Sequence, residues 1–221
     1  KPIIGVARDF VPERGIPRDV KTAFEASLNL LKEKGYEIKD ITLPHSSYAL
    51  MVYYILMPAE VSSNLARLEG MRFGSREEGK DLLQVYKNTR GKLFGKEVRR
   101  RIMLGTYVLS SGYYDAYYGQ ACLAREALAA SFRQVFAEVD LIATPTAPTP
   151  AWKIGEKSAD PLQMYLEDIF TVSANLARLP AISIPAGVSG NNLPIGVQLM
   201  APEFGENLLF EAGKKYEQDK V

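Results

Sequence analysis

Three consecutive arginines, Arg99, Arg100 and Arg101, form the most chemically suggestive run in the sequence. They stand between Val98 and Ile102 in a stretch predicted to be helical. Successive helix residues turn by about 100°, so the three guanidinium groups fan over roughly 200° and cannot all share the solvent face. At least one of them should therefore point toward the protein or a cleft. The alternative is a solvated charge run in which one arginine lays its stem along the surface.

Asp168 is a carboxylate on a mainly apolar side of another predicted helix, residues 160–176. Its neighbours three and four positions away are Met164, Tyr165, Thr171 and Val172. A carboxylate among such neighbours needs a partner or a cavity. Asp168 therefore either makes a structural ion pair or backbone hydrogen bond, or faces a ligand. The adjacent Glu167 lies nearer the polar side and is expected to be an ordinary surface acid.

The consecutive tyrosines Tyr53 and Tyr54 are a third candidate, because one hydroxyl could reach a ligand, although aromatic residues on a helix more often pack in the core. His45 is the one histidine, so a Ser-His-Asp or Cys-His mechanism would have to use it. It lies in a Pro/Ser-rich joint, which favours an ordinary surface-loop histidine. The one cysteine, Cys122, excludes an internal disulfide and a cysteine metal cluster, and no metal site is expected.

The composition excludes several functional classes. The 221 residues include 27 basic and 26 acidic side chains, a balance that argues against the strongly basic surface of a nucleic-acid-binding protein. With 47% hydrophobic and 24% charged residues the chain should fold, and no apolar run reaches the roughly 18–20 residues that span a bilayer. Residues 1–5 open like a strand and unlike a signal peptide, so we expect a cytoplasmic protein. We expect no phosphate-binding loop of the G-x-x-x-x-G-K or G-x-G-x-x-G kind and no nucleophile elbow of the G-x-S-x-G kind.

The elements that must position these residues follow from hydrophobic periodicity and from the Gly and Pro breaks. Strands are predicted at residues 3–7, 36–41, 140–143, 181–184 and 195–199. Helices are predicted at residues 20–34, with Asp19 as its cap, and at 49–68, 80–89, 96–111, 113–136, 160–176 and 206–217. Strand, helix and strand within the first 40 residues indicate a parallel βαβ unit, and the last two strands indicate a hairpin. We therefore predict an α/β fold, with a mixed β-sheet flanked by helices, in a single domain over residues 1–221.

Several segments of the sequence resemble the C-terminal half of the amidase signature family, and more narrowly the A subunits of the tRNA-dependent amidotransferases. The segments are Tyr53-Tyr54, AEVSSNLAR at 59–67, GKEVRRRIMLGT at 95–106, LSSGYYDAYY at 109–118, PTAPT at 145–149, DPLQMY at 160–165 and LPAISIPAG at 179–187. Together they extend over essentially the whole chain. The resemblance implies the amidase-signature fold, of which this chain would carry only the C-terminal portion.

The resemblance also implies roles for residues. The family uses a Ser–cis-Ser–Lys triad in a Gly/Ser-rich signature of its N-terminal half, and none of that signature is present here; Ser62-Ser63 and Ser110-Ser111 fall in predicted helices. In the family's other half an arginine and an aspartate hold the α-carboxylate and α-ammonium of glutamine. These map to Arg101, before Ile-Met-Leu-Gly, and to Asp168, in Met-Tyr-x-x-Asp, whereas Tyr53 maps to a tyrosine that lines the same pocket.

The implied function is the substrate-binding half of a glutaminase subunit, in which the chain alone is inactive. The ammonia would serve to convert Glu-tRNA(Gln), Asp-tRNA(Asn) or both. ATP and Mg²⁺ would bind a partner subunit, the misacylated tRNA would also bind through that partner, and the A, B and C subunits would form a heterotrimer. No cofactor is expected on this chain. Two alternatives remain at this point: a stand-alone amidase acting on small or aryl amides, and a non-catalytic docking module.

One residue departs from the family pattern. The family has Asn-Leu-Ala-Gly-Leu-Pro, whereas this chain has Arg178 in place of the glycine. If the glycine adopts a left-handed conformation, Arg178 should require a local rearrangement that affects the following strand. Residues 61–68 and 172–179 share the pattern V-S-x-N-L-A-R-L, but their flanks do not match, so we treat this similarity as coincidence.

Overall fold

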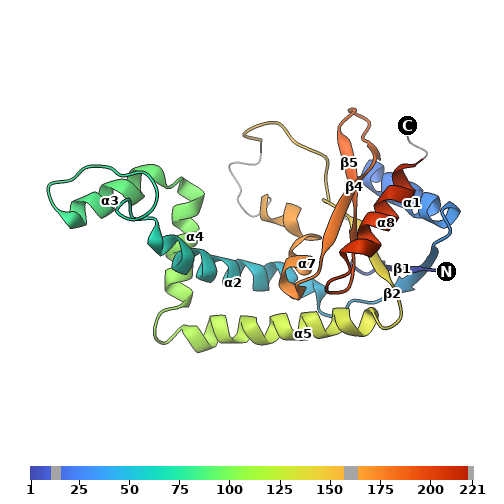
Figure 1. The fold of residues 1–221 in the computed structure, drawn as a ribbon, viewed down its shortest axis with the longest axis horizontal. Helices are drawn as coiled ribbons and strands as arrows, with labels where there is room; N and C mark the ends of the chain where they lie inside the picture. The colour runs from blue at the N-terminus through green and yellow to red at the C-terminus, as the bar shows by residue number, and fades with distance from the viewer. Residues whose placement is uncertain (11–15, 157–163, 219–221) are drawn as a thin grey trace. The chain divides into compact units, whose positions relative to one another are not determined.

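The computed structural model describes residues 1–10, 16–156 and 164–218 (Figure 1). The chain divides into two compact units, one of residues 1–50 with 125–221 and one of residues 51–124. We call the first the sheet unit and the second the helical unit. The divisions fall within two helices, α2 (Ala49–Asn64) and α5 (Gln120–Val135). The single-domain organisation of residues 1–221 stays a prediction.

The sheet unit begins with the predicted βαβ element. Strand β1 (Ile3–Ala7) pairs in parallel with β2 (Glu37–Ile41), and helix α1 (Arg18–Glu33) connects them. Gly35, at φ 93°, ends the helix as its position suggested, because glycine tolerates this left-handed conformation. The predicted cap is wrong: Pro17 holds the cap position, and Asp19 lies in the first turn. There the carboxylate accepts the Val20 backbone N–H at 2.9 Å.

Five strands form one mixed sheet in the order β2-β1-β3-β5-β4. Strand β3 (Leu141–Pro145) is parallel to β1, whereas β5 (Pro194–Met200) runs antiparallel to both β3 and β4 (Ala181–Val188). The predicted α/β class, the mixed sheet and the C-terminal hairpin are therefore confirmed. The short connection between β4 and β5 suits an antiparallel pair, whereas β1, β2 and β3 require longer crossovers.

Alternate residues of the strands divide between two faces of the sheet. One face packs against α1 and α8 (Glu206–Glu217), the helix predicted at residues 206–217. Its core consists of Ile4, Val6, Phe24, Leu28, Leu31, Tyr36, Leu141, Ala143, Ile184, Val197, Leu199, Ala201, Leu209, Ala212 and Tyr216. The intervening residues of β3 and β5, including Thr144 and Gln198, occupy the opposite face, on the side where Figure 1 shows α7 (Val172–Ala177). That polar pair matters for the candidate site.

The helical unit contains most of α2, then η2 (Leu65–Arg67), α3 (Leu82–Leu93), α4 (Lys96–Val108), the π-helical η3 (Tyr114–Gly119) and the start of α5. Helices α2 and α4 approach closely where Gly105 faces Pro58. A Cβ at Gly105 would lie 1.9 Å from the Pro58 carbonyl oxygen, so only glycine permits this approach. The predicted helix 113–136 begins as a π-helix, and Ser110 and Ser111 lie in the turn after α4 instead of in a helix.

The predicted helix 160–176 is not continuous: residues 164–165 and 172–176 are helical, but residues 166–171 interrupt the helix. Residues 157–163, which include the predicted start of this helix at Asp160, lie outside the described residues. After them come the 3₁₀-helical η4 (Leu166–Asp168), a turn, and α7. The Thr171 backbone N–H and hydroxyl both donate to the Asp168 carbonyl oxygen, at 3.0 and 3.1 Å, and this local bonding competes with a continuous α-helix. Across residues 1–10, 16–156 and 164–218, no helix is both long and apolar enough to cross a membrane.

Candidate functional site

Arg101 is the arginine of the run that turns inward. Its side chain is 26% exposed, against 54% for Arg100. The guanidinium donates from Nε to the Glu97 carboxylate at 2.9 Å and from Nη1 to the Met57 sulfur at 3.4 Å. Its carbon Cζ lies 5.6 Å from the centre of the Tyr54 ring. The prediction that at least one of the three arginines faces the protein is confirmed, and Arg99 is exposed.

The packing of α2 against α4 explains these contacts. Tyr54 and Met57 are three residues apart on α2 and so share a face of that helix. Glu97 is one helical turn before Arg101 on α4. The close approach at Gly105, four residues after Arg101, brings the two helix faces together. The backbone therefore holds the guanidinium between an aromatic ring, a thioether and a carboxylate.

The surroundings of Arg101 keep it charged. Burial opposes the charged form, but the hydrogen bond and the negative charge of Glu97 more than compensate, so the pKa of Arg101 is raised above its ordinary value. Glu97 also accepts a hydrogen bond from Arg100 at 2.6 Å. A planar guanidinium held this way presents a fork geometry suited to a carboxylate ligand.

Tyr53, the predicted pocket tyrosine, belongs to the same cluster. Its ring meets the Tyr54 ring edge to face, with centroids 5.2 Å apart and an interplanar angle of 87°. Tyr54 in turn lies against Arg101, so the helical unit links two of the three predicted site residues through one series of side-chain contacts. The sequence prediction named Tyr53 as a site residue and missed Tyr54, whose ring is the one beside Arg101. The three-residue spacing of Tyr54 and Met57 was the signal that could have indicated it.

Asp168, the third predicted site residue, is the last residue of η4 in the sheet unit and is half-buried. Its carbonyl oxygen closes the turn to Thr171. Phe170, two residues on, is fully buried, and its ring meets Phe10 edge to face with centroids 5.4 Å apart. Because Arg101 and Asp168 belong to different units, their joint action on one ligand stays a prediction.

Glu167 corrects the helix phase used for this segment. Its carboxylate accepts a hydrogen bond from the Thr149 hydroxyl at 2.8 Å, and the residue is half-buried. The expectation of an ordinary surface acid is therefore wrong. A 3₁₀-helix advances about 120° per residue instead of 100°, which moves Glu167 away from the predicted polar side. Neither acid of this pair is a freely solvated charge.

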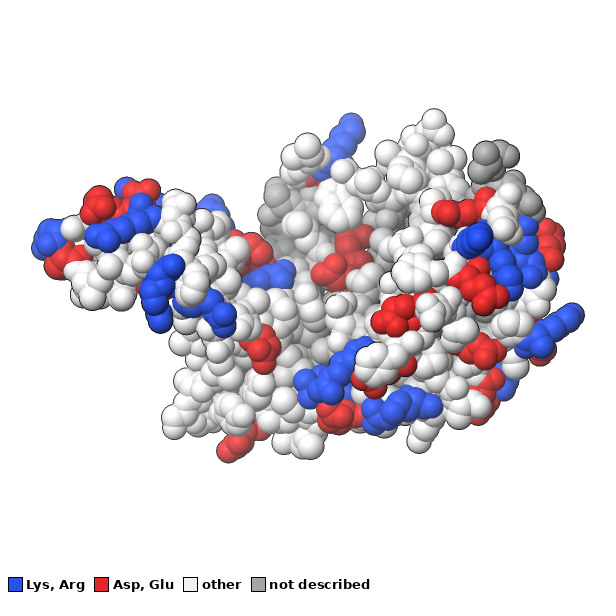
Figure 2. Space-filling model, in the orientation of Figure 1, with Lys and Arg blue, Asp and Glu red and all other residues white. Residues whose placement is uncertain are grey.

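The remaining candidates do not form a reactive site within the part of the chain that the structure describes. His45 is exposed and precedes the short 3₁₀-helix η1 (Ser46–Tyr48), as predicted for a surface-loop histidine. Cys122 is a free, half-buried thiol. No group of three or more His, Cys, Asp or Glu side chains is placed to hold a metal ion among these residues. Figure 2 shows basic and acidic side chains interspersed over the visible face, consistent with the near-neutral charge.

Residues 74–80 have the G-x-x-x-x-G-K spacing of a phosphate-binding loop, but Asp81 follows where such a loop has Ser or Thr. In the structure the Asp81 carboxylate accepts the Gln84 backbone N–H at 2.7 Å and caps α3. A carboxylate at this helix N-terminus occupies the position of an anion and repels phosphate. This segment is therefore a capped helix start.

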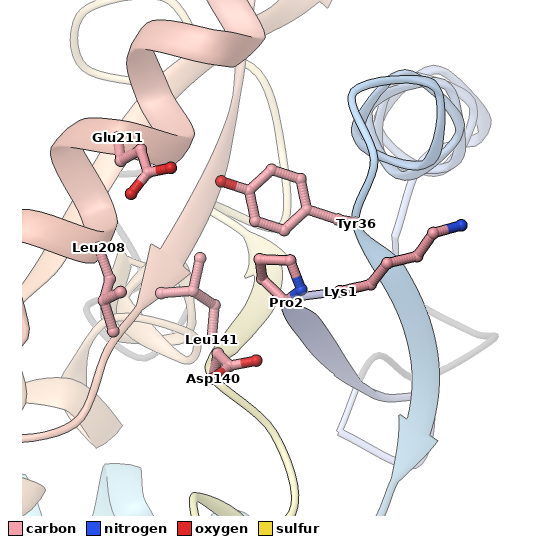
Figure 3. Close-up of a pocket in the computed structure, with 7 residues that line it drawn as sticks. All are labelled: Lys1, Pro2, Tyr36, Asp140, Leu141, Leu208 and Glu211. Carbon is pink, nitrogen blue, oxygen red and sulfur yellow. The ribbon is translucent and has the colours of Figure 1, made fainter.

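A pocket of about 300 Å³ lies at the amino-terminal ends of β1 and β3 (Figure 3). The Tyr36 ring, the Asp140 and Glu211 carboxylates, and Leu141 and Leu208 line it together with residues 1 and 2. The Asp140 carboxylate accepts the Ile3 backbone N–H at 2.6 Å, which ties the two strand starts together. None of the predicted site residues lines this pocket. It belongs to the end of the sheet opposite to the carboxyl ends of the parallel strands, where ligands of α/β folds usually bind.

Comparison with known proteins bears on the family. The chain is 51% identical over 214 residues to the A subunit of glutamyl-tRNA(Gln) amidotransferase from Maricaulis maris, covering 97% of this chain and 43% of that protein. The corresponding protein of Geobacter metallireducens is 50% identical over 216 residues, covering 97% of this chain and 44% of its own length. The chain thus spans less than half the length of these curated relatives.

Solved structures agree with the sequence relationship. The A subunit of glutamyl-tRNA(Gln) amidotransferase from Thermotoga maritima is 37% identical with a TM-score of 0.74, over 99% of this chain and 42% of that protein. A solved amidase shares the fold with a TM-score of 0.73 at 20% identity, over 100% of this chain and 46% of that protein. Residues 1–210 match the sequence model of the family described as Amidase. The resemblance found in the sequence is confirmed, and the chain belongs to the amidase signature family.

Proposed function

We propose that this chain forms the substrate-binding half of the glutaminase subunit of a tRNA-dependent amidotransferase. The observation that carries the proposal is the identity of about 50%, over 97% of the chain, to relatives that are named as the A subunit of glutamyl-tRNA(Gln) amidotransferase. The full-length enzyme would hydrolyse glutamine and supply ammonia for converting Glu-tRNA(Gln), Asp-tRNA(Asn) or both to the correctly amidated forms.

In this proposal the substrate-binding residues recognise the two charges of a zwitterionic amino acid. Arg101 takes the α-carboxylate, Asp168 takes the α-ammonium, and Tyr53 lines the same pocket. The raised pKa of Arg101 supports its part, because the side chain stays cationic despite partial burial. The Tyr54 ring beside the guanidinium restricts access of water and strengthens the attraction of a carboxylate. An apolar-amide hydrolase would have no use for such a cation.

The reaction itself requires groups beyond those present. Hydrolysis of the glutamine side-chain amide needs an activated nucleophile, and we assign this role to the Ser–cis-Ser–Lys triad of the longer protein. Residues 1–221 bind and orient glutamine without a cofactor or metal of their own. ATP and Mg²⁺ would act at a partner subunit that also binds the misacylated tRNA, in a cytoplasmic heterotrimer of the A, B and C subunits.

A chimera tests the proposal. The region of the Maricaulis maris relative that matches this chain is replaced by the chain, and the product is expressed with the partner subunits of that relative. Ammonia release from glutamine is then measured, with and without Glu-tRNA(Gln). We expect glutamine hydrolysis that an Asp168→Asn substitution weakens strongly. Hydrolysis of a simple aryl amide at full rate, with no activity on glutamine, would identify a stand-alone amidase and overturn the proposal.

A further inference from the structure

Gln198 of β5 is a buried amide that links the sheet to the segment carrying Asp168. The residue is only 5% exposed. The amide nitrogen Nε2 donates to the Thr144 hydroxyl of the neighbouring strand β3 at 3.0 Å and to the Phe170 carbonyl oxygen, also at 3.0 Å. Gln198 and Thr144 are directly opposite in the β3–β5 register. The donor is therefore mounted on a paired interior strand, the most rigid kind of support in this unit.

The acceptor of this amide lies in the turn that begins at Asp168. The Asp168 carbonyl oxygen accepts the Thr171 N–H and hydroxyl, which closes residues 168–171 into one turn. The Phe170 ring is fully buried against Phe10, and its carbonyl is fixed by Gln198. Removing the amide would leave two buried acceptors without this donor, and the turn would lose its polar attachment to the sheet.

We propose that Gln198 is a positioning residue for substrate binding. By holding the Phe170 carbonyl it fixes the turn, and the turn fixes the direction of the Asp168 carboxylate toward the α-ammonium of glutamine. This inference rests on the proposed function and deepens it. In this proposal Gln198 does not contact the substrate but sets the position of the Asp168 carboxylate. A small displacement of that carboxylate would weaken its contact with the substrate ammonium.

A second buried hydrogen bond supplies the matched control. The Ser27 hydroxyl bonds to the Tyr216 hydroxyl at 2.7 Å between α1 and α8, on the opposite face of the same sheet. Ser27 is 1% exposed, so it is as buried as Gln198. Loss of the Ser27 hydroxyl removes a buried polar contact from the same unit but does not affect the hydrogen bonds of residues 168–171. A merely structural role of Gln198 would make the two substitutions behave alike.

The test compares Gln198→Met with Ser27→Ala in the full-length protein, in complex with its partners. We expect Gln198→Met to raise KM for glutamine at least tenfold with kcat within twofold, and Ser27→Ala to leave both within twofold. In an Asp168→Asn background, Gln198→Met should change KM less than twofold. If Gln198→Met does not fold, Gln198→Leu serves the same comparison, because leucine is also uncharged and has no hydrogen-bond donor for the Phe170 carbonyl.

Amide hydrogen exchange separates this inference from the proposed function. Exchange at Thr171 should accelerate at least tenfold in Gln198→Met and stay unchanged in Ser27→Ala. An unchanged KM, equal effects of the two substitutions, or unchanged exchange at Thr171 would each overturn the positioning role. A wild-type enzyme without glutaminase activity would overturn the proposed function, and the exchange experiment would still decide whether Gln198 anchors the turn.

Discussion

Arg178 adopts the left-handed conformation that its position requires, and replacing it with glycine should stabilise the protein. Arg178 has φ 58° and ψ 39° at the end of α7. The Leu179 N–H bonds to the Ala174 carbonyl at 2.9 Å and the Arg178 N–H to the Asn175 carbonyl at 3.3 Å, the pair of bonds of a Schellman motif. The expected rearrangement is therefore absent, and β4 begins regularly with Ala181 opposite Met200.

The size of the effect follows from two opposing contributions. A non-glycine residue in this region costs about 1–2 kcal/mol. Glycine in turn gives the unfolded chain extra freedom, worth about 0.4–1 kcal/mol. The Arg178 side chain is exposed, so its removal should cost little packing. Arg178→Gly should therefore raise the free energy of unfolding by about 0.8 kcal/mol, the midpoint of these opposing ranges, or the melting temperature by about 2–3 °C.

The similar segment at residues 61–68 offers a control within the same chain. Arg67 follows the same Asn-Leu-Ala sequence but belongs to the 3₁₀-helix η2, outside the left-handed region. Arg67→Gly should lower stability by about 0.5–1 kcal/mol, because glycine there gains flexibility and relieves no strain. Urea-unfolding curves of both variants measure the difference. A destabilised Arg178→Gly, or two shifts of the same sign, would refute the reasoning.

Three further predictions concern activity and association. Asp168→Asn in the full-length enzyme should weaken glutamine capture by about 2–4 kcal/mol in kcat/KM, and Arg101→Lys should weaken it less, whereas exposed Arg99→Lys should stay within about 0.5 kcal/mol. The 221-residue chain alone should release no ammonia from glutamine; release that persists through repurification would contradict this. The same chain should self-associate through β4, an edge strand among the described residues, and Val188→Lys, at a 60% exposed position, should reduce association measured by sedimentation.

Local pattern was sufficient to predict most of the sheet unit. Strands 3–7 and 36–41, with the helix between them, follow from alternating and helical periodicity, since each element buries one side in the same core. The end of α1 was predictable because Gly35 adopts a left-handed conformation that glycine tolerates better than other residues. Asp19 was predicted as the N-cap only because aspartate is a residue type that often caps helices. Its carboxylate instead bonds the next residue, and sequence does not distinguish these two short-range choices.

The candidate site was predictable in its charges but less so in its contacts. Helix geometry correctly predicted that one of the three consecutive arginines points inward. The partners of Arg101, however, depend on the close approach of α2 and α4. That approach rests on Gly105 facing Pro58, two residues 47 positions apart with no shared local pattern. Long-range packing therefore selected Tyr54 as the ring beside Arg101, whereas the sequence indicated only that the hydroxyl of either Tyr53 or Tyr54 could reach a ligand.

Asp168 was chosen from a continuous helix that the structure does not have, and its role in binding stays a prediction. Helical phase separated an inward Asp168 from an outward Glu167, yet the structure gives a 3₁₀ turn in which both are half-buried. Glu167 is bonded to Thr149, so Glu167→Gln, which keeps an acceptor for that hydroxyl, does not by itself test which acid binds substrate. The distinction between the two acids depends on the turn, because Asp168 begins the loop that Gln198 attaches to the sheet. The two acids therefore differ in their hydrogen-bonded surroundings, and comparing Gln198→Met in the wild-type and Asp168→Asn backgrounds tests the predicted role of Asp168.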